Sequence, residues 1–233
     1  MKEIPRVYLD NAASTPIDPT VIEVMMPFIV DHFGNPSSLH DMGRKATIAI
    51  SKSRSVISKL IGANPNEIYF TSGGTESNNL ALVGYAKMVK KLRPDCNRIL
   101  ISEIEHESIL ETVRYLEKDL KFTVDFIRTT SDGFVDLNSY RDLLSPETCL
   151  VSVMLVNNEI GTIQPVQSMI DILKKRQYKA VFHSDGVQAL GKIPIDVRQM
   201  KLDMLSISSH KINGPKGVGA LYVRKGIFLE PIL

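Results

Sequence analysis

The chain has 233 residues, of which 43% are hydrophobic and 23% are charged, and this balance predicts a globular protein with one large core. The 28 lysines and arginines nearly cancel the 26 aspartates and glutamates and are scattered along the chain, which argues against nucleic-acid binding. Because no apolar run reaches the roughly 18 residues that span a bilayer and the N-terminus has no apolar signal segment, we expect a cytoplasmic protein without membrane contact.

The two cysteines, Cys96 and Cys149, are too few for a disulfide framework and lack the paired spacing of a zinc site. Free cysteines are typical of a reducing compartment, which agrees with a cytoplasmic location. His106 has acidic neighbours, but no second histidine stands at ligand spacing, so we expect no metal site.

Short apolar runs alternate with longer amphipathic segments along the chain. This alternation predicts an α/β fold in which helices cover both faces of a mostly parallel central sheet. The expected helices are residues 19–31, 44–61, 76–92, 108–119, 138–144 and 166–176. The expected strands are residues 68–70, 98–102, 123–128, 149–156, 180–183, 204–208 and 220–223.

Polar residues follow five of the expected strands. Because ligands of parallel sheets gather at the carboxyl ends of the strands, we expect these residues to share one site. They are the segment 71–75, His106, Asn157, Asp185, and the pair His210 and Lys211.

Lys211 and Asp185 suggest an aldehyde cofactor. A lysine among hydroxyl groups and backbone donors suits a Schiff base with an aldehyde whose phosphate also needs donors. A carboxylate such as Asp185 can hold a pyridine nitrogen protonated, which makes the ring an electron sink. Taken singly, Lys211 is read as a solvated loop lysine and Asp185 as a turn residue. Their occurrence together, in this order, favours the cofactor.

Residues 72–76, Ser-Gly-Gly-Thr-Glu, connect an expected strand to an expected helix. Small residues there let backbone amides approach an anion, and the helix N-terminus attracts negative charge. The segment matches neither the dinucleotide fingerprint nor the Walker lysine motif, so it predicts a phosphate site without a nucleotide. Read alone, it is an N-capped loop.

His106 and Asn157 each have two interpretations. The histidine could lie flat on a cofactor ring or exchange protons, although a lone histidine is more often structural. The asparagine could bind a ring oxygen or a substrate carboxylate, although buried asparagines commonly hold a turn.

Six segments of the chain resemble the cysteine desulfurases of the NifS/IscS type, and they occur in that family's order. They are residues 8–16, 33–38, 70–79, 156–161, 185–188 and 208–217. The resemblance covers nearly the whole chain and implies the fold-type I architecture of enzymes that use pyridoxal 5′-phosphate. It also implies a homodimer that removes sulfur from L-cysteine, giving alanine and a protein persulfide for iron-sulfur cluster assembly or tRNA thiolation.

The resemblance assigns a role to each matching residue. Lys211 would bond covalently to the cofactor, Asp185 would pair with the pyridine nitrogen, and His106 would stack on the ring. Gln188 would bond the ring hydroxyl oxygen, and Asn157 would lie beside the substrate. The remaining expected cofactor-binding residues are Gly74, Thr75, Ser208 and His210, the last three as phosphate ligands.

The same resemblance sets the expected domain organisation. Residues 1–15 would join a small domain in an intact homologue, and residues 16–233 would form the cofactor-binding large domain. The family continues into a small domain that carries a carboxylate-binding arginine and the sulfur-accepting cysteine. We therefore expect this chain to be incomplete for catalysis, since Cys149 is predicted to be buried in a strand and Cys96 to lie at the sheet end opposite the site.

Two other functions remain open at this stage. A selenocysteine lyase-like enzyme would share the cofactor motifs, which do not read the substrate side chain. A non-catalytic fragment would keep the cofactor site or a dimer surface without removing sulfur. In the intact enzyme we also expect a sulfur-acceptor or scaffold protein as partner.

Overall fold

The computed structural model describes residues 7–232. Within that range seven strands form one sheet: β1 (Ile68–Thr71), β2 (Arg98–Ser102), β3 (Thr123–Ile127), β4 (Thr148–Ser152), β5 (Val181–Asp185), β6 (Met204–Ser208) and β7 (Gly219–Val223). Their order across the sheet is β1-β7-β6-β5-β4-β2-β3. Strand β7 pairs antiparallel with β1 and β6, and the other pairs are parallel. The predicted α/β fold with a mostly parallel sheet is confirmed.

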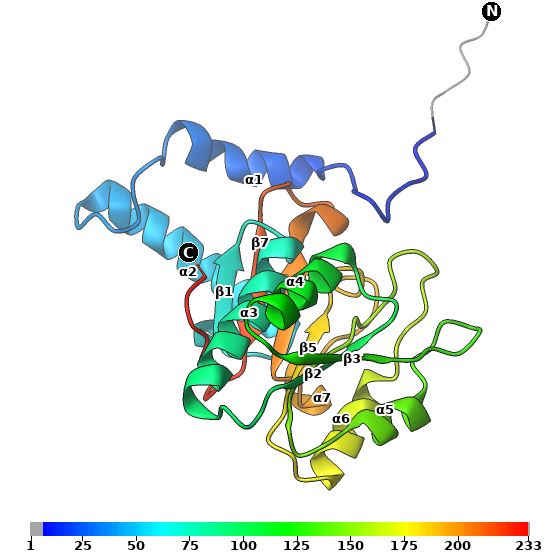
Figure 1. Cartoon of the computed structure of the whole chain (residues 1–233). Coiled ribbons are helices and arrows are strands. Elements are labelled where there is room, and N and C mark those ends of the chain that lie inside the picture. Colours follow the sequence, from blue (N-terminus) through cyan, green and yellow to red (C-terminus); the bar gives the residue numbers. More distant parts are fainter. Residues whose placement is uncertain (1–6, 233) are drawn as a thin grey trace, which may run out of the picture.

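Helices cover both faces of this sheet, as Figure 1 shows. The helices are α1 (Pro19–Val30), α2 (Asp41–Leu60), α3 (Gly74–Leu92), α4 (Glu107–Lys118), α5 (Leu137–Leu143), α6 (Val166–Lys175) and α7 (Val197–Met200), with 3-10 turns η1 (Pro65–Glu67) and η2 (Ser209–Lys211). Helices α3 and α4 pack on one face, and α5 and α6 pack on the other.

The central strands are buried on both faces. In β2, Ile99 and Ile101 pack beneath α3 and α4, whereas Leu100 between them faces the core beneath α5 and α6. Successive side chains of a strand point to opposite faces, so a strand with two covered faces needs a continuous apolar run. This requirement explains why the short apolar runs of the sequence locate the strands.

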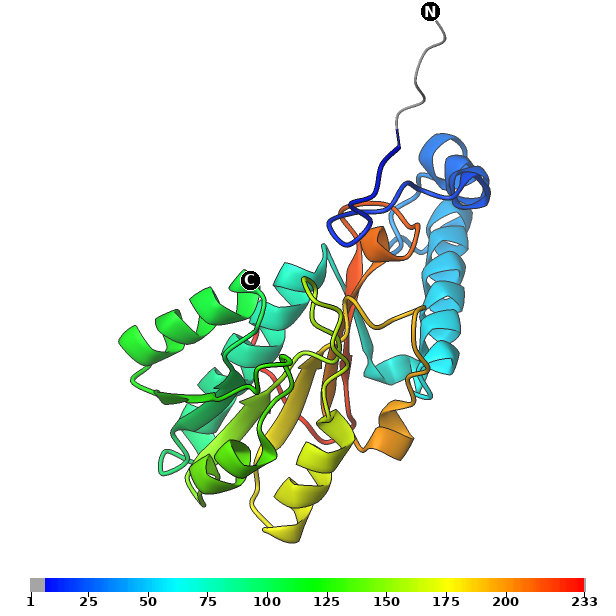
Figure 2. The ribbon, with the colours of Figure 1, turned by 90° about the vertical axis from the view of Figure 1, so that its right-hand side faces the viewer.

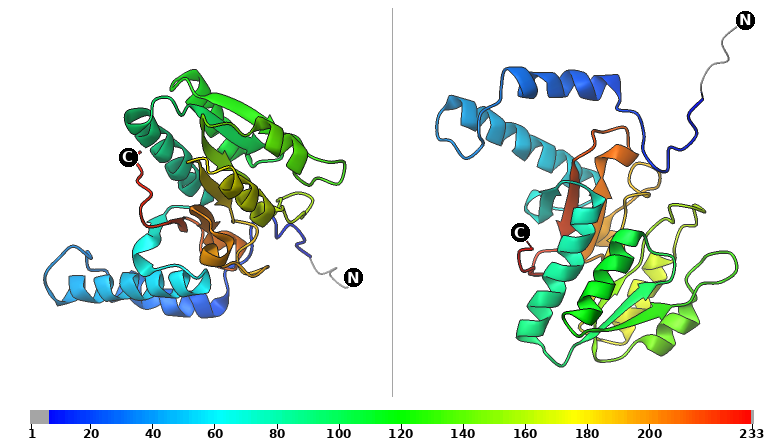
Figure 3. Two further views of the ribbon diagram at one scale, coloured as in Figure 1. Left: turned by 90° about the horizontal axis from the view of Figure 1, so that it is seen from below. Right: turned by 45° about the horizontal axis from the view of Figure 1, so that its top comes forward.

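Helices α1 and α2 lie together at one side of the molecule, next to the β1 edge of the sheet (Figures 2 and 3). Helix α1 is rich in apolar residues, yet none of the residues that the structure describes in it is buried. It has 12 residues. Across residues 7–232, no helix combines the length and the apolar character that crossing a membrane requires.

Several boundaries differ from those predicted. The expected strand over residues 149–156 ends as a regular strand at Ser152, although the amides of Val153 and Leu155 still donate to the β5 carbonyls of His183 and Asp185. Residues 153–156 therefore continue alongside β5 without regular strand pairing, which the apolar pattern of the sequence does not reveal. The short helix α7 and the 3-10 turns were not predicted, because they are too short to produce a periodic pattern.

A buried histidine joins the three central parallel strands. His183 of β5 contacts the hydroxyl of Ser152 on β4 through Nδ1 at 2.8 Å and the hydroxyl of Ser206 on β6 through Nε2 at 2.9 Å. Burial lowers the pKa of His183 to about 3, so the ring is neutral in the folded protein. His183 lies two residues before Asp185 on the same face of β5, where it fixes the end of the strand.

This lowered pKa predicts a pH-dependent contribution to stability. Below its ordinary pKa of about 6.5, the histidine gains a proton in the unfolded chain but not in the folded protein. The contribution of the buried ring to the free energy of unfolding is therefore fully present well above pH 6.5 and is lost progressively as the pH falls below that value. The stability advantage of the wild type over His183→Gln should shrink by about 1.6 kcal/mol between pH 6.5 and pH 5.

Urea unfolding of both proteins at the two pH values measures this change. The buried carboxyl of Glu105 titrates in both proteins, and its contribution cancels in the comparison. An advantage that is independent of pH would contradict a neutral buried His183.

Candidate functional site

A cavity of about 670 Å³ opens at the carboxyl ends of the parallel strands. Seven of the residues singled out in the sequence line it: Gly74, Thr75, His106, Asp185, Gln188, His210 and Lys211. Residues outside the predicted set line it as well, among them Asp10, Ala12, Ala13, Asn78, Ser108 and Val187. The strand-end rule therefore brings residues from distant parts of the chain into one cavity.

Lys211 ends η2, which directly follows β6. Its Nζ donates to the carbonyl oxygens of Ala12 and Ala13, the latter at 2.8 Å, so the N-terminal segment runs beside η2 (Figure 2). Partial burial and the nearby charge of Lys192 lower the pKa of Lys211, while Asp10 and Asp185 oppose that shift. A lowered pKa increases the fraction of free amine, which is the form that attacks a carbonyl group.

Asp185 is the last residue of β5 and is buried. Its Oδ2 accepts a hydrogen bond of 2.7 Å from Nδ2 of Asn78, and its Oδ1 accepts one of 2.9 Å from the amide of Val187. Burial raises the pKa of Asp185, and these two donors oppose the shift. The carboxylate is thus held rigidly in a place where an additional cationic donor would stabilise its charge.

A chain of hydrogen bonds leads from Asp185 to His106. Asn78 donates from Nδ2 to the hydroxyl of Ser108 at 2.9 Å as well as to Asp185. The Ser108 hydroxyl lies 2.8 Å from Nδ1 of His106, and the Ser108 amide donates to the same nitrogen at 3.0 Å. Because Nδ1 is the acceptor, the neutral ring of His106 carries its proton on Nε2.

The N-terminus of α3 forms a narrow cup. The amide and hydroxyl of Ser72 both donate to the carboxylate of Glu76, which fixes the loop before the helix. A Cβ atom on Gly74 would lie 2.7 Å from Cγ2 of Val187, so only glycine fits between the helix and the turn after β5. The side chain of Ser208 lies beside Gly74, since a Cβ atom on this glycine would be 3.7 Å from Cβ of Ser208, and the buried Ser208 hydroxyl has no hydrogen-bond partner within residues 7–232.

Asn157 lies beside the cavity, not in its wall. Its Oδ1 accepts from the amides of Glu159 and Ile160, and its Nδ2 donates to the carbonyl of Ile104 at 3.1 Å. The side chain thus holds a turn, which is the structural interpretation of this residue. Its contact with a substrate stays a prediction.

Three functional candidates escaped the sequence analysis. Asn78 and Ser108 connect Asp185 to His106, as described above. Glu105 is buried, accepts from the hydroxyl of Ser102 and from the amide of Met154 at 2.9 Å, and burial raises its pKa to about 8. Asn78 lies one helical turn after Gly74 and therefore on the same face of α3. It could have been found from this position if the start of the helix had been known.

The cavity fits a flat heterocycle that carries an aldehyde and a phosphate. An amine with a lowered pKa, a buried carboxylate and an imidazole surround it, and the orphaned Ser208 hydroxyl lies next to a helix N-terminus. The fold and the site together define an α/β protein with a cavity at the carboxyl ends of its strands, where a lysine is placed to bind a cofactor that carries an aldehyde.

Comparison with known proteins places the chain in a family. The family model described as "Aminotransferase class-V" matches residues 7–232, so this chain belongs to that family. The chain is 47% identical to "Cysteine desulfurase IscS" of Dictyoglomus turgidum over 227 residues, which cover 97% of this chain and 56% of that protein.

Two solved structures are similar along nearly the whole chain. One named "NIFS-LIKE PROTEIN" has a TM-score of 0.94 and 42% identity, with 98% of this chain and 62% of that chain covered. Another, named "SspA in complex with cysteine", has a TM-score of 0.91 and 39% identity, with 97% of this chain and 64% of that chain covered. The chain spans about half the length of the curated relatives it matches.

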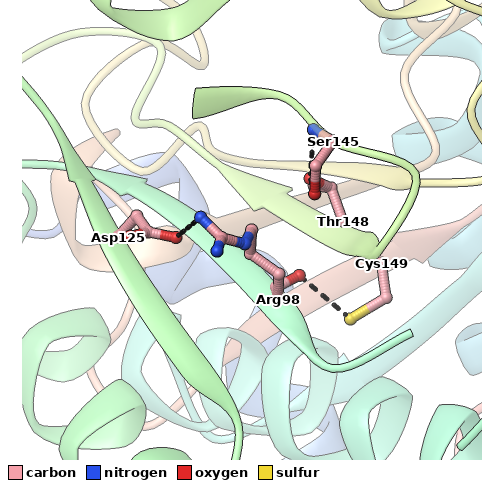
Figure 4. A network of polar contacts seen from close by, with 5 residues as sticks. All are labelled: Arg98, Asp125, Ser145, Thr148 and Cys149. Atoms are coloured by element: carbon pink, nitrogen blue, oxygen red, sulfur yellow. Dashed lines mark hydrogen bonds and ion pairs between the residues drawn. The ribbon is translucent and has the colours of Figure 1, made fainter. Parts of the chain in front are cut away.

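Both cysteines lie away from the cavity. Cys149 is buried near the start of β4, where its thiol donates to the carbonyl of Arg98 beside the Arg98–Asp125 ion pair (Figure 4). Burial raises the pKa of Cys149 to about 12, so the thiol stays protonated near neutral pH. Cys96 is half-buried just before β2, at the same amino end of the sheet. The predicted burial of Cys149 is confirmed.

Removing Asn78 should destabilise the protein. In Asn78→Ala the buried groups of Asp185 and Ser108 lose a donor, which should lower the free energy of unfolding by about 1–3 kcal/mol. Asn138→Ala is the matched control, because Asn138 is an exposed asparagine near the start of α5 whose side chain accepts from the exposed Arg141. Urea unfolding near pH 7 measures both, and an equal loss in the two variants would contradict the special role of Asn78.

Proposed function

We propose that this chain is the cofactor-binding part of a cysteine desulfurase that uses pyridoxal 5′-phosphate and acts on L-cysteine. The observation that carries the proposal is the single cavity in which Lys211, Asp185 and His106 meet at the ends of three strands. The names of the relatives support the reaction, and the relative solved in complex with cysteine supports the substrate.

Each predicted site residue has a role in this proposal. Lys211 would bond covalently to the cofactor, His106 would stack on its ring, and Gln188 would donate to the ring oxygen. The phosphate is held at the N-terminus of α3 and beside η2, by Gly74, Thr75, Ser208 and His210. When bound, pyridoxal phosphate supplies an electron-withdrawing ring that weakens the bonds at the α-carbon of an amino acid.

Asp185 holds a proton on the ring nitrogen. A carboxylate that accepts two hydrogen bonds and lies in a buried position forms a strong charge-assisted bond to a protonated nitrogen. Asn78 and Val187 fix the direction of the carboxylate, so Asp185 would both orient the pyridine ring and keep its nitrogen protonated.

Lys211 moves protons at the substrate. Partial burial lowers its pKa, which increases the fraction of free amine that can act as nucleophile and as base. Asn157 would lie beside the substrate. The buried thiol of Cys149 and the distant thiol of Cys96 leave the sulfur acceptor outside these two residues.

The wider organisation is part of the same proposal. Residues 16–233 form the large domain, residues 1–15 join a small domain, and two copies pair as a homodimer in a cytoplasmic pathway with a sulfur-acceptor or scaffold protein. A selenocysteine lyase-like activity is the alternative substrate choice. A fragment that binds cofactor without catalysis is the alternative to enzymatic function.

The covalent role of Lys211 is directly testable. Purified chain incubated with pyridoxal phosphate and reduced with sodium borohydride should carry a stable adduct on Lys211, since this amine lines the cavity and has a lowered pKa. Mass spectrometry of tryptic peptides locates the adduct. Lys216→Ala is the matched control in the same loop and should keep the label, whereas Lys211→Ala should lose it.

A label on another lysine of the wild type would contradict the proposed site. Alanine production from L-cysteine and from L-selenocysteine by the same preparation distinguishes the two substrates. Labelling of Lys211 without alanine from either amino acid is expected both of the proposed cofactor-binding part and of a non-catalytic fragment, because neither Cys96 nor Cys149 is placed to accept sulfur.

A further inference from the structure

A second lysine lies close to the site. Lys192 follows Gln188 by four residues in the turn after β5, where the amides of Lys192 and Ile193 donate to the carbonyl of Ala189. Gly191 has a φ of +74°, a left-handed conformation that suits glycine and ends the turn. Residues four apart in such a helical turn lie on one side, so Gln188 and Lys192 face each other.

The two side chains are joined by a short hydrogen bond. Nζ of Lys192 donates to Oε1 of Gln188 at 2.7 Å, and Nε2 of Gln188 donates to the carbonyl of Ala12 at 2.8 Å. An ammonium group is only a donor and a carbonyl oxygen is only an acceptor. Both neighbours therefore select the same orientation of the amide.

Gln188 lines two adjoining cavities. It lines the main cavity together with Lys211, and it lines an adjoining cavity of about 450 Å³ together with Lys192 and Ala12. Among the described residues, one N–H of the amide is used by Ala12, so the other is free to donate to an oxygen in the main cavity. Lys192 thus contacts Gln188 from the side opposite to the main cavity.

The positive charge of Lys192 also acts on Lys211. The turn of Lys192 is close to η2, because a Cβ atom on Gly191 would lie 3.2 Å from Cγ2 of Ile212. Partial burial lowers the pKa of both lysines, and for Lys211 the charge of Lys192 lowers the pKa further. The carboxylates of Asp10 and Asp185 act in the opposite direction.

We propose that Lys192 is a positioning residue that holds the Gln188 amide with a free N–H directed at the ligand oxygen in the main cavity. The proposal rests on the proposed function, because it takes that oxygen to be the ring oxygen of pyridoxal phosphate. An N–H donor of Gln188 stabilises an anionic ring oxygen. In the opposite orientation of the amide, the carbonyl oxygen of Gln188 would face the ring oxygen and repel it.

The first test measures the affinity for pyridoxal phosphate by absorbance titration. Lys192→Met should weaken binding roughly three- to tenfold, the effect of one oriented hydrogen bond. Lys192→Arg keeps a charged donor and should bind like the wild type. The double variant Lys192→Met, Gln188→Met should bind no more weakly than Gln188→Met, because Lys192 acts through Gln188.

The second test needs no cofactor. The rate at which an amine-specific reagent labels Lys211, followed by mass spectrometry over a pH series, gives the midpoint of Lys211 deprotonation. This midpoint should rise in Lys192→Met and stay near the wild-type value in Lys192→Arg. Lys174→Met is the matched control, because Lys174 is another partly buried lysine with a lowered pKa, at the other end of the sheet.

Two outcomes would overturn the inference. In the first, Lys192→Met matches Lys174→Met in both cofactor affinity and the Lys211 midpoint. In the second, the double variant binds more weakly than Gln188→Met by the full loss of Lys192→Met, which would show that Lys192 does not act through Gln188. A wild type that binds no pyridoxal phosphate would instead contradict the proposed function. In that case the labelling experiment still tests the inference, because an unchanged midpoint of Lys211 deprotonation in Lys192→Met would overturn the coupling of the two lysines.

Discussion

The site depends on keeping a carboxylate buried at the end of a central strand. Burial of Asp185 disfavours its charge, so the protein must supply donors that hold the carboxylate in place. Asn78 provides one of them, and the same amide group fixes Ser108 and through it His106. The donor that holds this buried group is therefore also linked to the imidazole, and it ties the start of α3 to the site.

The sheet turns this local requirement into a cavity. Parallel strands end at one edge, so the turns after β2, β5 and β6 bring His106, Asp185 and Lys211 together although they lie far apart in sequence. His183 ties the three central strands together two residues before Asp185, which leaves the strand end little freedom. The glycine at the start of α3 lets this helix approach the turn after β5 closely enough to complete the wall.

The sequence allowed much of this site to be predicted. Short apolar runs mark strands that are buried on both faces, and the polar residues that follow them, such as Asp185 and Lys211, line the cavity. The contacts that support them could not be predicted. The start of α3 was placed two residues too late, which hid the alignment of Asn78 with Gly74, and Lys192 acts through a short turn that has no periodicity. The apolar run to residue 156 also suggested a longer β4 than the structure has.

The central claim is that Asp185 makes the bound ring an electron sink, and exchange of the α-proton of L-alanine in deuterium oxide tests it most directly. Asp185→Asn should still bind pyridoxal phosphate but exchange this proton roughly 100-fold or more slowly than the wild type, as expected when one positioned group that stabilises developing charge is lost. Asp203→Asn, which changes a buried carboxylate just before β6 at the other end of the sheet, is the control and should exchange at the wild-type rate. Exchange at the wild-type rate in Asp185→Asn would contradict the claim.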